Sequence, residues 1–422
     1  MTNAAGSSAP VVVAPERMGR AWLVVGLLWM VACLNLLDRI MLTTMRGSVM
    51  AAIPMTDAQF GLLTSVFLWV YALCSPFAGF VADRFSRSRV IIGSLLVWSA
   101  MTWLTSRATT FEGLLITRAL MGISEACYVP AGLALIMDYH RGATRSRATG
   151  VHMTGMMTGA SLGGLGGWVA ERHSWSYAFS LFGLIGIGYA LVLMFFLRDV
   201  PRVERAENAA ETTLPPDGFG AALRSLFGSR AFVLAFFYWG LFGILWTVIG
   251  WMPTYFTEKF HLGQGVAGLS ATGYFQMASL VGVLLGGFWA DYWSRTNPRA
   301  RIYVPAIGLL IAAPALVMVA GTDIFALAIL GLILTGLTRA FTDANMMPIL
   351  CLISDPRYRA TGYGVLNLCS AGIGGLSIYV GGALRDGGIP LPRLFQFSGA
   401  SLLLCALLLF LIRPRAEPAV AT

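Results

Sequence analysis

The chain has 422 residues, of which 57% are hydrophobic and only 12% are charged. A soluble domain carries about 25% charged residues, so the composition excludes a water-soluble protein and requires that most of the outer surface face lipid. The formal net charge of +9 can indicate nucleic-acid binding. Here the basic residues lie in short segments between apolar runs, a pattern that sets membrane topology instead, and we predict no nucleic-acid partner.

Apolar runs long enough to cross a bilayer, which takes about 20 residues as a helix, recur along the whole chain. In chain order we place the spans at 21–45, 58–82, 89–106, 112–137, 148–170, 176–197, 231–256, 266–290, 302–320, 324–350, 361–383 and 394–412. Only a helix satisfies its own backbone hydrogen bonds in lipid at these lengths. The sequence therefore predicts an all-α, polytopic membrane protein with 12 transmembrane helices.

The longest polar stretch, 198–230, divides the predicted spans into six and six. We predict a six-helix bundle over 21–197, a linker over 198–230 and a second bundle over 231–413. Residues 1–20 and 414–422 are expected to be tails, the first disordered. Most Lys and Arg residues lie on the side of both tails and the linker, which by the positive-inside rule is cytoplasmic. We therefore expect an inner cell-membrane protein with both termini in the cytoplasm.

The two halves repeat three short motifs in the same order and at a nearly constant offset. The pairs are GFVADRFSR at Gly79 with GFWADYWSR at Gly287, RATG at Arg147 with RATG at Arg359, and GGL at Gly163 with GGL at Gly374. Duplicated halves that face each other across a central site are a design of transporters. The sequence therefore predicts a solute transporter and not an enzyme.

These features resemble the major facilitator superfamily, and the resemblance covers nearly the whole chain. The segment Gly79–Arg89 matches the loop motif of that family between spans 2 and 3. The resemblance implies that Asp83 and Arg84 latch helices together in one access state, and that Asp291 does so in the second copy. Tyr292 replaces the arginine there, which predicts a weaker latch. The alternative is a solvated turn that only fixes topology.

Ionisable side chains inside a membrane are energetically costly and indicate function. The predicted spans contain three basic and three acidic ones: Arg39, Arg118, Arg339, Asp38, Glu125 and Asp343. Asn35, Asp38 and Arg39 lie along one stripe of the first span. Arg118 and Glu125 are seven residues apart in the fourth span, so they share a face. Structural ion pairs without further function are the alternative.

The chemistry of these groups suggests two roles. A guanidinium offers a planar fork of donors that fits a carboxylate or phosphate, so Arg39 and Arg118 predict an anionic solute. A desolvated carboxyl whose proton affinity depends on a nearby arginine is a candidate proton switch, which applies to Glu125. No nucleotide-binding loop is present, so we predict no cofactor and take H⁺ as the coupling ion, with Na⁺ left open.

The same constellation resembles the anion:cation symporter branch of the superfamily, which includes hexuronate, galactonate and sialate transporters; Spinster-like lipid transporters show a similar pattern. The resemblance implies that Arg39 and Arg118 hold the anion and that Asp38 and Glu125 carry protons. The branch often has a tyrosine where this chain has Leu36, so one hydroxyl contact to a sugar acid is expected to be missing.

The second half offers weaker candidates. Arg339 and Asp343 are four residues apart, which predicts either an intrahelical salt bridge or a contact with the substrate. Trp246 could stack against a sugar ring. Gln276 and Asn367 could bind hydroxyl groups, or they could only join helices.

The sequence thus predicts a secondary active transporter that works by alternating access and takes up a small organic anion, such as a sugar acid, by proton-coupled symport. Two alternatives remain. A Spinster-like lysolipid or amphiphile transporter would need a wide apolar cavity, and an exporter of drugs or metabolites would need an acidic one. The expected partners are the anionic solute and the lipid bilayer, and by resemblance the protein is a monomer.

Overall fold

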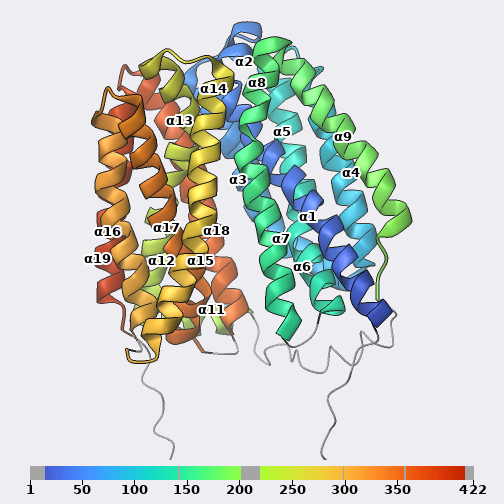
Figure 1. Ribbon diagram of the computed structural model, residues 1–422, viewed down its shortest axis with the longest axis vertical. Coiled ribbons are helices and arrows are strands. Elements are labelled where there is room, and N and C mark those ends of the chain that lie inside the picture. The colour runs from blue at the N-terminus through green and yellow to red at the C-terminus, as the bar shows by residue number, and fades with distance from the viewer. Residues whose placement is uncertain (1–14, 141–142, 201–218, 298, 356–357, 414–422) are drawn as a thin grey trace, which may run out of the picture.

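The structure is a computed structural model that describes residues 15–140, 143–200, 219–297, 299–355 and 358–413. Throughout these ranges every regular element is a helix (Figure 1), so the predicted all-α fold is confirmed. Most of the predicted tails and linker, at 1–14, 201–218 and 414–422, lies outside the described residues. The first helix already begins at Pro15, six residues before the predicted span.

The first bundle consists of the helices described before position 200. They are α1 (Pro15–Thr44), α2 (Arg46–Ala52), α3 (Asp57–Arg84), α4 (Arg87–Thr105), α5 (Phe111–Ala126), α6 (Tyr128–Tyr139), α7 (Ala143–Leu162), α8 (Gly164–Arg172) and α9 (Trp175–Phe196). Hydroxyl side chains cap the start of four of them by accepting a backbone N–H bond: Thr56, Ser86, Thr110 and Ser174. Such caps fix where a helix begins.

The second bundle follows the same plan. Its elements are α11 (Phe219–Phe227), α12 (Arg230–Phe242), α13 (Leu245–Phe260), α14 (Gln264–Leu269), the π-helical turn η1 (Ser270–Tyr274), α15 (Phe275–Ser294), α16 (Ala300–Gly321), α17 (Phe325–Ile353), α18 (Arg359–Asp386) and α19 (Leu391–Leu411). The short helix α11 lies within the stretch expected to be the linker. In both bundles several crossings are interrupted, as at Cys127 between α5 and α6.

Among the described residues, 11 helical segments are long and apolar enough to cross a membrane. The remaining predicted span, 148–170, corresponds to α7 and α8, which do not meet that criterion. Its sequence is rich in glycine, threonine and methionine, and the helix breaks at Gly163. These helices pack against α1, α14 and α15, so this crossing relies on protein contacts more than on apolar surface.

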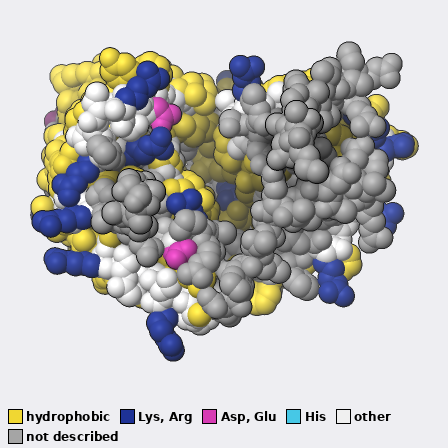
Figure 2. All heavy atoms as spheres, turned by 90° about the horizontal axis from the view of Figure 1, so that it is seen from below, with side chains coloured by type: hydrophobic (Ala, Val, Ile, Leu, Met, Phe, Trp, Pro, Cys, Tyr) yellow, Lys and Arg dark blue, Asp and Glu magenta, His cyan; other side chains and the backbone are white. Residues whose placement is uncertain are grey.

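The two bundles stand side by side and contact each other mainly at one end (Figure 1). We call this the closed end; it holds α2, α8 and α14. At the opposite, terminal end, α1 begins and α19 finishes. Seen from the terminal end, the surface between the bundles is hollowed and the visible part is largely hydrophobic (Figure 2).

Glycines from matching tracts of the two halves allow the close approach at the closed end. A Cβ on Gly164 of α8 would lie 2.5 Å from the Cα of Leu269 in the other bundle, and one on Gly382 of α18 would lie 2.2 Å from the carbonyl oxygen of Asp57. Any larger side chain would push the bundles apart there. The sequence of these tracts therefore favours a conformation closed at this end.

Candidate functional site

Two helices of the first bundle, α1 and α5, bring the predicted polar residues together in the membrane interior. Glu125 of α5 is fully buried, and its Oε2 accepts hydrogen bonds from Asn35 Nδ2 at 2.8 Å and from Arg39 Nε at 2.7 Å. Both donors belong to α1, so one carboxylate joins the two helices. The second oxygen of Glu125 has no hydrogen-bond partner among the described residues.

Asp38 lies on a different side of α1 and faces α4. It is almost fully buried, and Thr102 donates a long hydrogen bond of 3.4 Å to its Oδ2. Its other oxygen has no partner in the described part of the chain. Adjacent helix residues point about 100° apart, which is why Asp38 and Arg39 meet different partners. A buried carboxyl with so few donors is poorly matched to its ionised form.

Arg118 is the most unusual member of the group. Its side chain is buried, yet no described carboxylate lies within salt-bridge distance of it. Its Nε donates to the backbone oxygen of Leu63 at 3.5 Å, its Nη1 approaches Met121 Sδ at 3.3 Å, and its Nη2 has no partner within the described ranges. A buried charge without a counterion is costly. The position is therefore suited to receive an anion.

Aromatic rings of α3 complete the group. The Phe67 ring centroid lies 5.0 Å from Arg39 Cζ and 4.8 Å from Arg118 Cζ, and Tyr71 lies 4.2 Å from Arg39 Cζ. Phe67 thus contacts both guanidiniums, and its ring face attracts each of them. The sequence analysis missed these rings, although two aromatic residues four positions apart in an apolar span were a usable signal.

We call Asn35, Asp38, Arg39, Arg118 and Glu125 the buried charge cluster. Arg39 and Arg118 line a cavity of about 20 Å³ between the bundles, and Trp246 and Ile378 line it from the second half. A volume of this size holds about one water molecule. An organic anion therefore requires the bundles to move apart before it can reach these guanidiniums.

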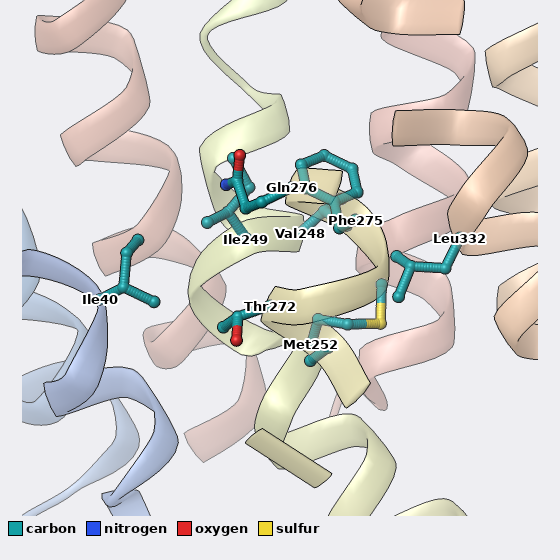
Figure 3. A pocket seen from close by; sticks show the side chains of 9 residues that line it. Ile40, Val248, Ile249, Met252, Thr272, Phe275, Gln276 and Leu332 are labelled. Carbon is teal, nitrogen blue, oxygen red and sulfur yellow. The ribbon is translucent and has the colours of Figure 1, made fainter. Parts of the chain in front are cut away.

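A second, smaller cavity of about 10 Å³ adjoins the first, because Ile40 and Ile249 line both. Figure 3 shows Ile40 from the first bundle facing Ile249, Thr272 and Gln276 from the second. The predicted residues Trp246 and Gln276 thus lie where the two halves meet. Asn367 of α18 is exposed and lines neither cavity, so its proposed contact with substrate stays a prediction.

Arg339 and Asp343 form an ion pair along α17, with 3.0 Å between Arg339 Nη1 and Asp343 Oδ2. Arg339 also donates to Ser279 Oγ at 3.2 Å and lies over the Phe275 ring. The intrahelical salt bridge that the spacing allowed is therefore present. Asp343 keeps about a third of its side chain exposed, and a substrate contact there remains a prediction.

The predicted gating residues lie at the terminal end. The side chain of Asp83 lies outside the described residues. Arg84 is the last residue of α3 and is exposed, and Asp291 pairs with Arg301 at 2.9 Å within the second bundle. The pair of Asp291 and Arg301 lies within one bundle, so a latch at this end stays a prediction.

Four charged residues instead join the bundles at the closed end, and we call them the closed-end charge cluster: Arg46, Asp57, Glu258 and Arg385. Asp57 accepts from Arg46 Nε and from Arg385 Nε, each at 2.8 Å. Glu258 accepts from Arg385 Nη1 and Nη2 at 2.9 and 2.8 Å, and lies 3.7 Å from Arg46 Nη1. Each arginine contacts carboxylates of both bundles, so the cluster ties the halves together.

Two further carboxylates reach across the closed end in a reciprocal way. Asp386, at the end of α18, accepts from the backbone N–H groups of Asp57 and Ala58 at 2.9 Å each, at the start of α3. Glu171, near the end of α8, accepts from the backbone N–H of Gly265 at 2.8 Å, at the start of α14. A carboxylate at a helix N-terminus is favourable. Each bundle therefore caps one helix of the other.

Comparison with known proteins adds to this geometry. A family model described as Major Facilitator Superfamily matches residues 28–378. Protein spinster of Drosophila melanogaster is 28% identical over 323 residues, which are 73% of this chain and 52% of that protein. The chain thus matches about half the length of this relative.

Two bacterial relatives are matched more completely. A D-galactonate transporter of Escherichia coli is 28% identical over 291 residues, 64% of this chain and 67% of that one. A probable sulfoacetate transporter of Cupriavidus necator is 26% identical over 417 residues, 94% of this chain and 95% of that one.

Solved structures show the same fold. A bacterial homolog of the human lysosomal transporter Spinster, in an inward-facing and unoccupied conformation, has a TM-score of 0.73 at 22% identity, with 95% of this chain and 96% of that chain covered. Its inward-facing and occupied form has a TM-score of 0.74 at the same identity, with 95% and 97% covered. At this level of identity the likeness establishes the architecture.

Proposed function

The chain belongs to the Major Facilitator Superfamily and is a transporter, and on this basis we propose that it takes up a small organic anion together with protons. The observation that carries the proposal is Arg118, a buried guanidinium with no carboxylate partner among the described residues, at a cavity between the two bundles. A carboxylate or sulfonate would supply the missing counterion.

Proton coupling follows from the competition for Arg39. In the structure Glu125 holds Arg39 through a charge-assisted hydrogen bond. Protonation of Glu125 removes its negative charge and weakens that bond, which frees Arg39 to join Arg118 on the anion. Asp38 is the second proton carrier in this proposal, because its burial and its single donor favour the neutral form.

Access would alternate by rocking of the bundles. The conformation described here is closed by the contacts of α3 with α18 and of α8 with α14, and the cavity beside Arg118 is too small for an organic anion. Transport then requires the closed-end charge cluster to separate in another state. Because of the positive-inside bias, we propose that the terminal end lies on the cytoplasmic side of an inner membrane. We also propose that the monomer is the transporting unit.

The names of the relatives limit the range of candidate solutes. D-galactonate and sulfoacetate transporters both handle small organic anions, and we propose a sugar acid of the hexuronate, aldonate or sialate class as the substrate. In this arrangement Trp246 offers a ring face and Gln276 a hydrogen-bonding amide at the interface of the halves. H⁺ is the proposed coupling ion, and the direct control is to measure uptake driven by a Na⁺ gradient in place of the proton gradient.

A second candidate is the transport of a lysolipid or similar amphiphile. It is favoured by the Spinster-related proteins among the relatives and by the mostly apolar lining of both cavities. Export of cationic drugs has no comparable support, since Arg39 and Arg118 are the ionised side chains that line the two described cavities between the bundles.

A thermal-shift screen of the purified protein separates these candidates. The ligands are hexuronates, aldonates, sialic acid, sulfoacetate, monocarboxylates and lysolipids. We expect a sugar acid to raise the Tm of the wild type and of Arg107→Gln, an exposed arginine at the closed end, but not of Arg118→Gln. Stabilisation by lysolipids alone, with no effect of Arg118→Gln, would overturn the anion proposal.

A further inference from the structure

A large cavity lies away from the buried charge cluster, at the terminal end of the second bundle. Its volume is about 710 Å³, and it is bounded by the ends of α11, α12, α17 and α19 and by the residue that precedes α16. It contains no residue of the proposed transport site. Its position at one end of a membrane-spanning bundle places it at the level of lipid headgroups.

The charges around this cavity are strongly biased. Arg230, Arg299 and Arg413 line it, against a single acidic residue, Asp355. No described carboxylate pairs with any of the three arginines, and the one side-chain hydrogen bond among them runs from Arg299 Nη1 to Tyr303 Oη at 3.4 Å. Figure 2 shows basic side chains grouped on this end of the molecule. Such a cavity attracts a phosphate group.

Two apolar stripes run from the cavity along the outside of the bundle. On α19, Leu404, Leu407 and Leu411 are exposed and lie on one face by their spacing. That stripe ends beside Arg413.

On α12, Leu234 and the exposed Phe237 follow Arg230 at four and seven residues, so they continue one face from that arginine. The two helices are neighbours, since Cys405 Sγ of α19 lies 3.5 Å from the carbonyl oxygen of Tyr238 in α12. Each stripe therefore starts at an arginine of the same cavity and leads into the region of the acyl chains.

We propose that this cavity binds an anionic diacyl phospholipid. Its phosphate is held by Arg230, Arg299 and Arg413, and its two acyl chains lie along the stripes of α12 and α19. Basic pockets between transmembrane helices recognise anionic headgroups in this way. The proposal does not depend on the transported solute, nor on which side of the membrane the terminal end faces.

The test uses the full chain purified in detergent and native mass spectrometry with phosphatidylglycerol and zwitterionic phosphatidylcholine. Because each basic residue adds to the attraction for an anionic lipid, we expect a preference for phosphatidylglycerol of about tenfold or more. The triple variant R230Q/R299Q/R413Q should lose this preference. The matched control R107Q/R172Q/R393Q removes the same charge from exposed positions at the closed end and should keep it.

Further arms separate a lipid from a free phosphate and guard against misfolding. Inorganic phosphate and glycerol 3-phosphate should compete weakly, because they cannot use the stripes, and Leu407→Ser with Leu411→Ser should weaken phosphatidylglycerol binding. If the triple variant does not fold, Arg413→Gln alone, at the exposed end of α19, should still reduce the preference. Equal binding of both lipids, equal loss in the control triple, or full competition by inorganic phosphate would overturn the proposal.

Discussion

The buried charge cluster and the closed-end charge cluster use the same residue types but complete their pairings to different degrees. At the closed end, Arg46 and Arg385 each contact both Asp57 and Glu258. In the buried charge cluster Arg118 contacts no described carboxylate. The comparison teaches that complete pairs across two bundles hold a conformation, whereas an incomplete pair inside one bundle leaves a place for a ligand or a proton.

The surroundings of the clusters also differ. Glu258 has 47% of its side chain exposed, whereas Glu125 is fully buried. Ion pairs with an exposed partner, such as those of Glu258, contribute about 0–1 kcal/mol each, while removing one partner of a buried pair costs about 3–5 kcal/mol. Substitutions should therefore have large effects in the buried charge cluster, and at the closed end Glu258 should be less sensitive than Asp57, whose side chain is only 12% exposed.

The largest effect is expected for Arg118→Ala. The variant should fold, because no carboxylate loses its partner, but the anion should lose its main contact. Truncation at a buried charged contact costs about 2–5 kcal/mol, so the initial rate of uptake should fall about 100-fold. Uptake in whole cells measures it, with Arg107→Ala as the control for a lost surface charge. Uptake near the wild-type rate would place the anion elsewhere.

A smaller loss is expected for Asp38→Asn. The amide keeps the shape of the carboxyl but carries no exchangeable charge, so uptake driven by a pH gradient should fall while substrate binding persists. Proteoliposome uptake and a thermal shift with the same anion measure the two effects. Thr102→Val, which removes only the hydroxyl that contacts Asp38, should leave the coupling intact. An equal loss of gradient-driven uptake in both variants would mean that Asp38 serves only in packing.

Gly164→Val should disturb the closed end. Its side chain would meet the backbone at Leu269. Overpacking costs about 1–3 kcal/mol, and here it destabilises only the conformation that is closed at that end. Labelling of a single cysteine introduced between the bundles near Thr44 should become faster. Gly188→Val is the matched control, because a Cβ there meets no atom within 4 Å. Unchanged labelling in Gly164→Val would mean that the contact does not limit opening.

The smallest effects are expected for the two reciprocal caps. Asp386→Asn and Glu171→Gln each remove one carboxylate from a helix N-terminus, an interaction worth about 0.3–1 kcal/mol at an exposed position. The double variant should shift the same labelling rate by the product of the two single effects, because the caps lie on different helices. A strongly non-additive result would show that they act as one unit.

The helices and the buried charge cluster could be predicted from the sequence because both follow from local pattern. Runs of apolar residues fix the spans, and the spacing of Asn35, Asp38 and Arg39 places them on one stripe. Which carboxylate pairs with which arginine could not be predicted, since it depends on the packing of α1 on α5. The link from Glu125 to Arg39 instead of Arg118 is such a case.

The closed end was even less accessible to sequence analysis. Arg46 and Asp57 meet Glu258 and Arg385 of the other half, and all four residues lie near span ends, where charged residues are ordinary. The caps by Glu171 and Asp386 had one available signal. Both are acidic residues at corresponding ends of the duplicated halves, but their hydrogen bonds to the other bundle depend on how the two bundles pack.

Glu125→Gln tests the coupling of anion to proton most directly. The measurement compares, in proteoliposomes, exchange of labelled anion across the membrane with accumulation driven by an inward proton gradient, using the exposed Glu112→Gln as control. The account predicts that Glu125→Gln exchanges anion but no longer accumulates it, while the control does both. Accumulation by Glu125→Gln at the wild-type level would contradict the account.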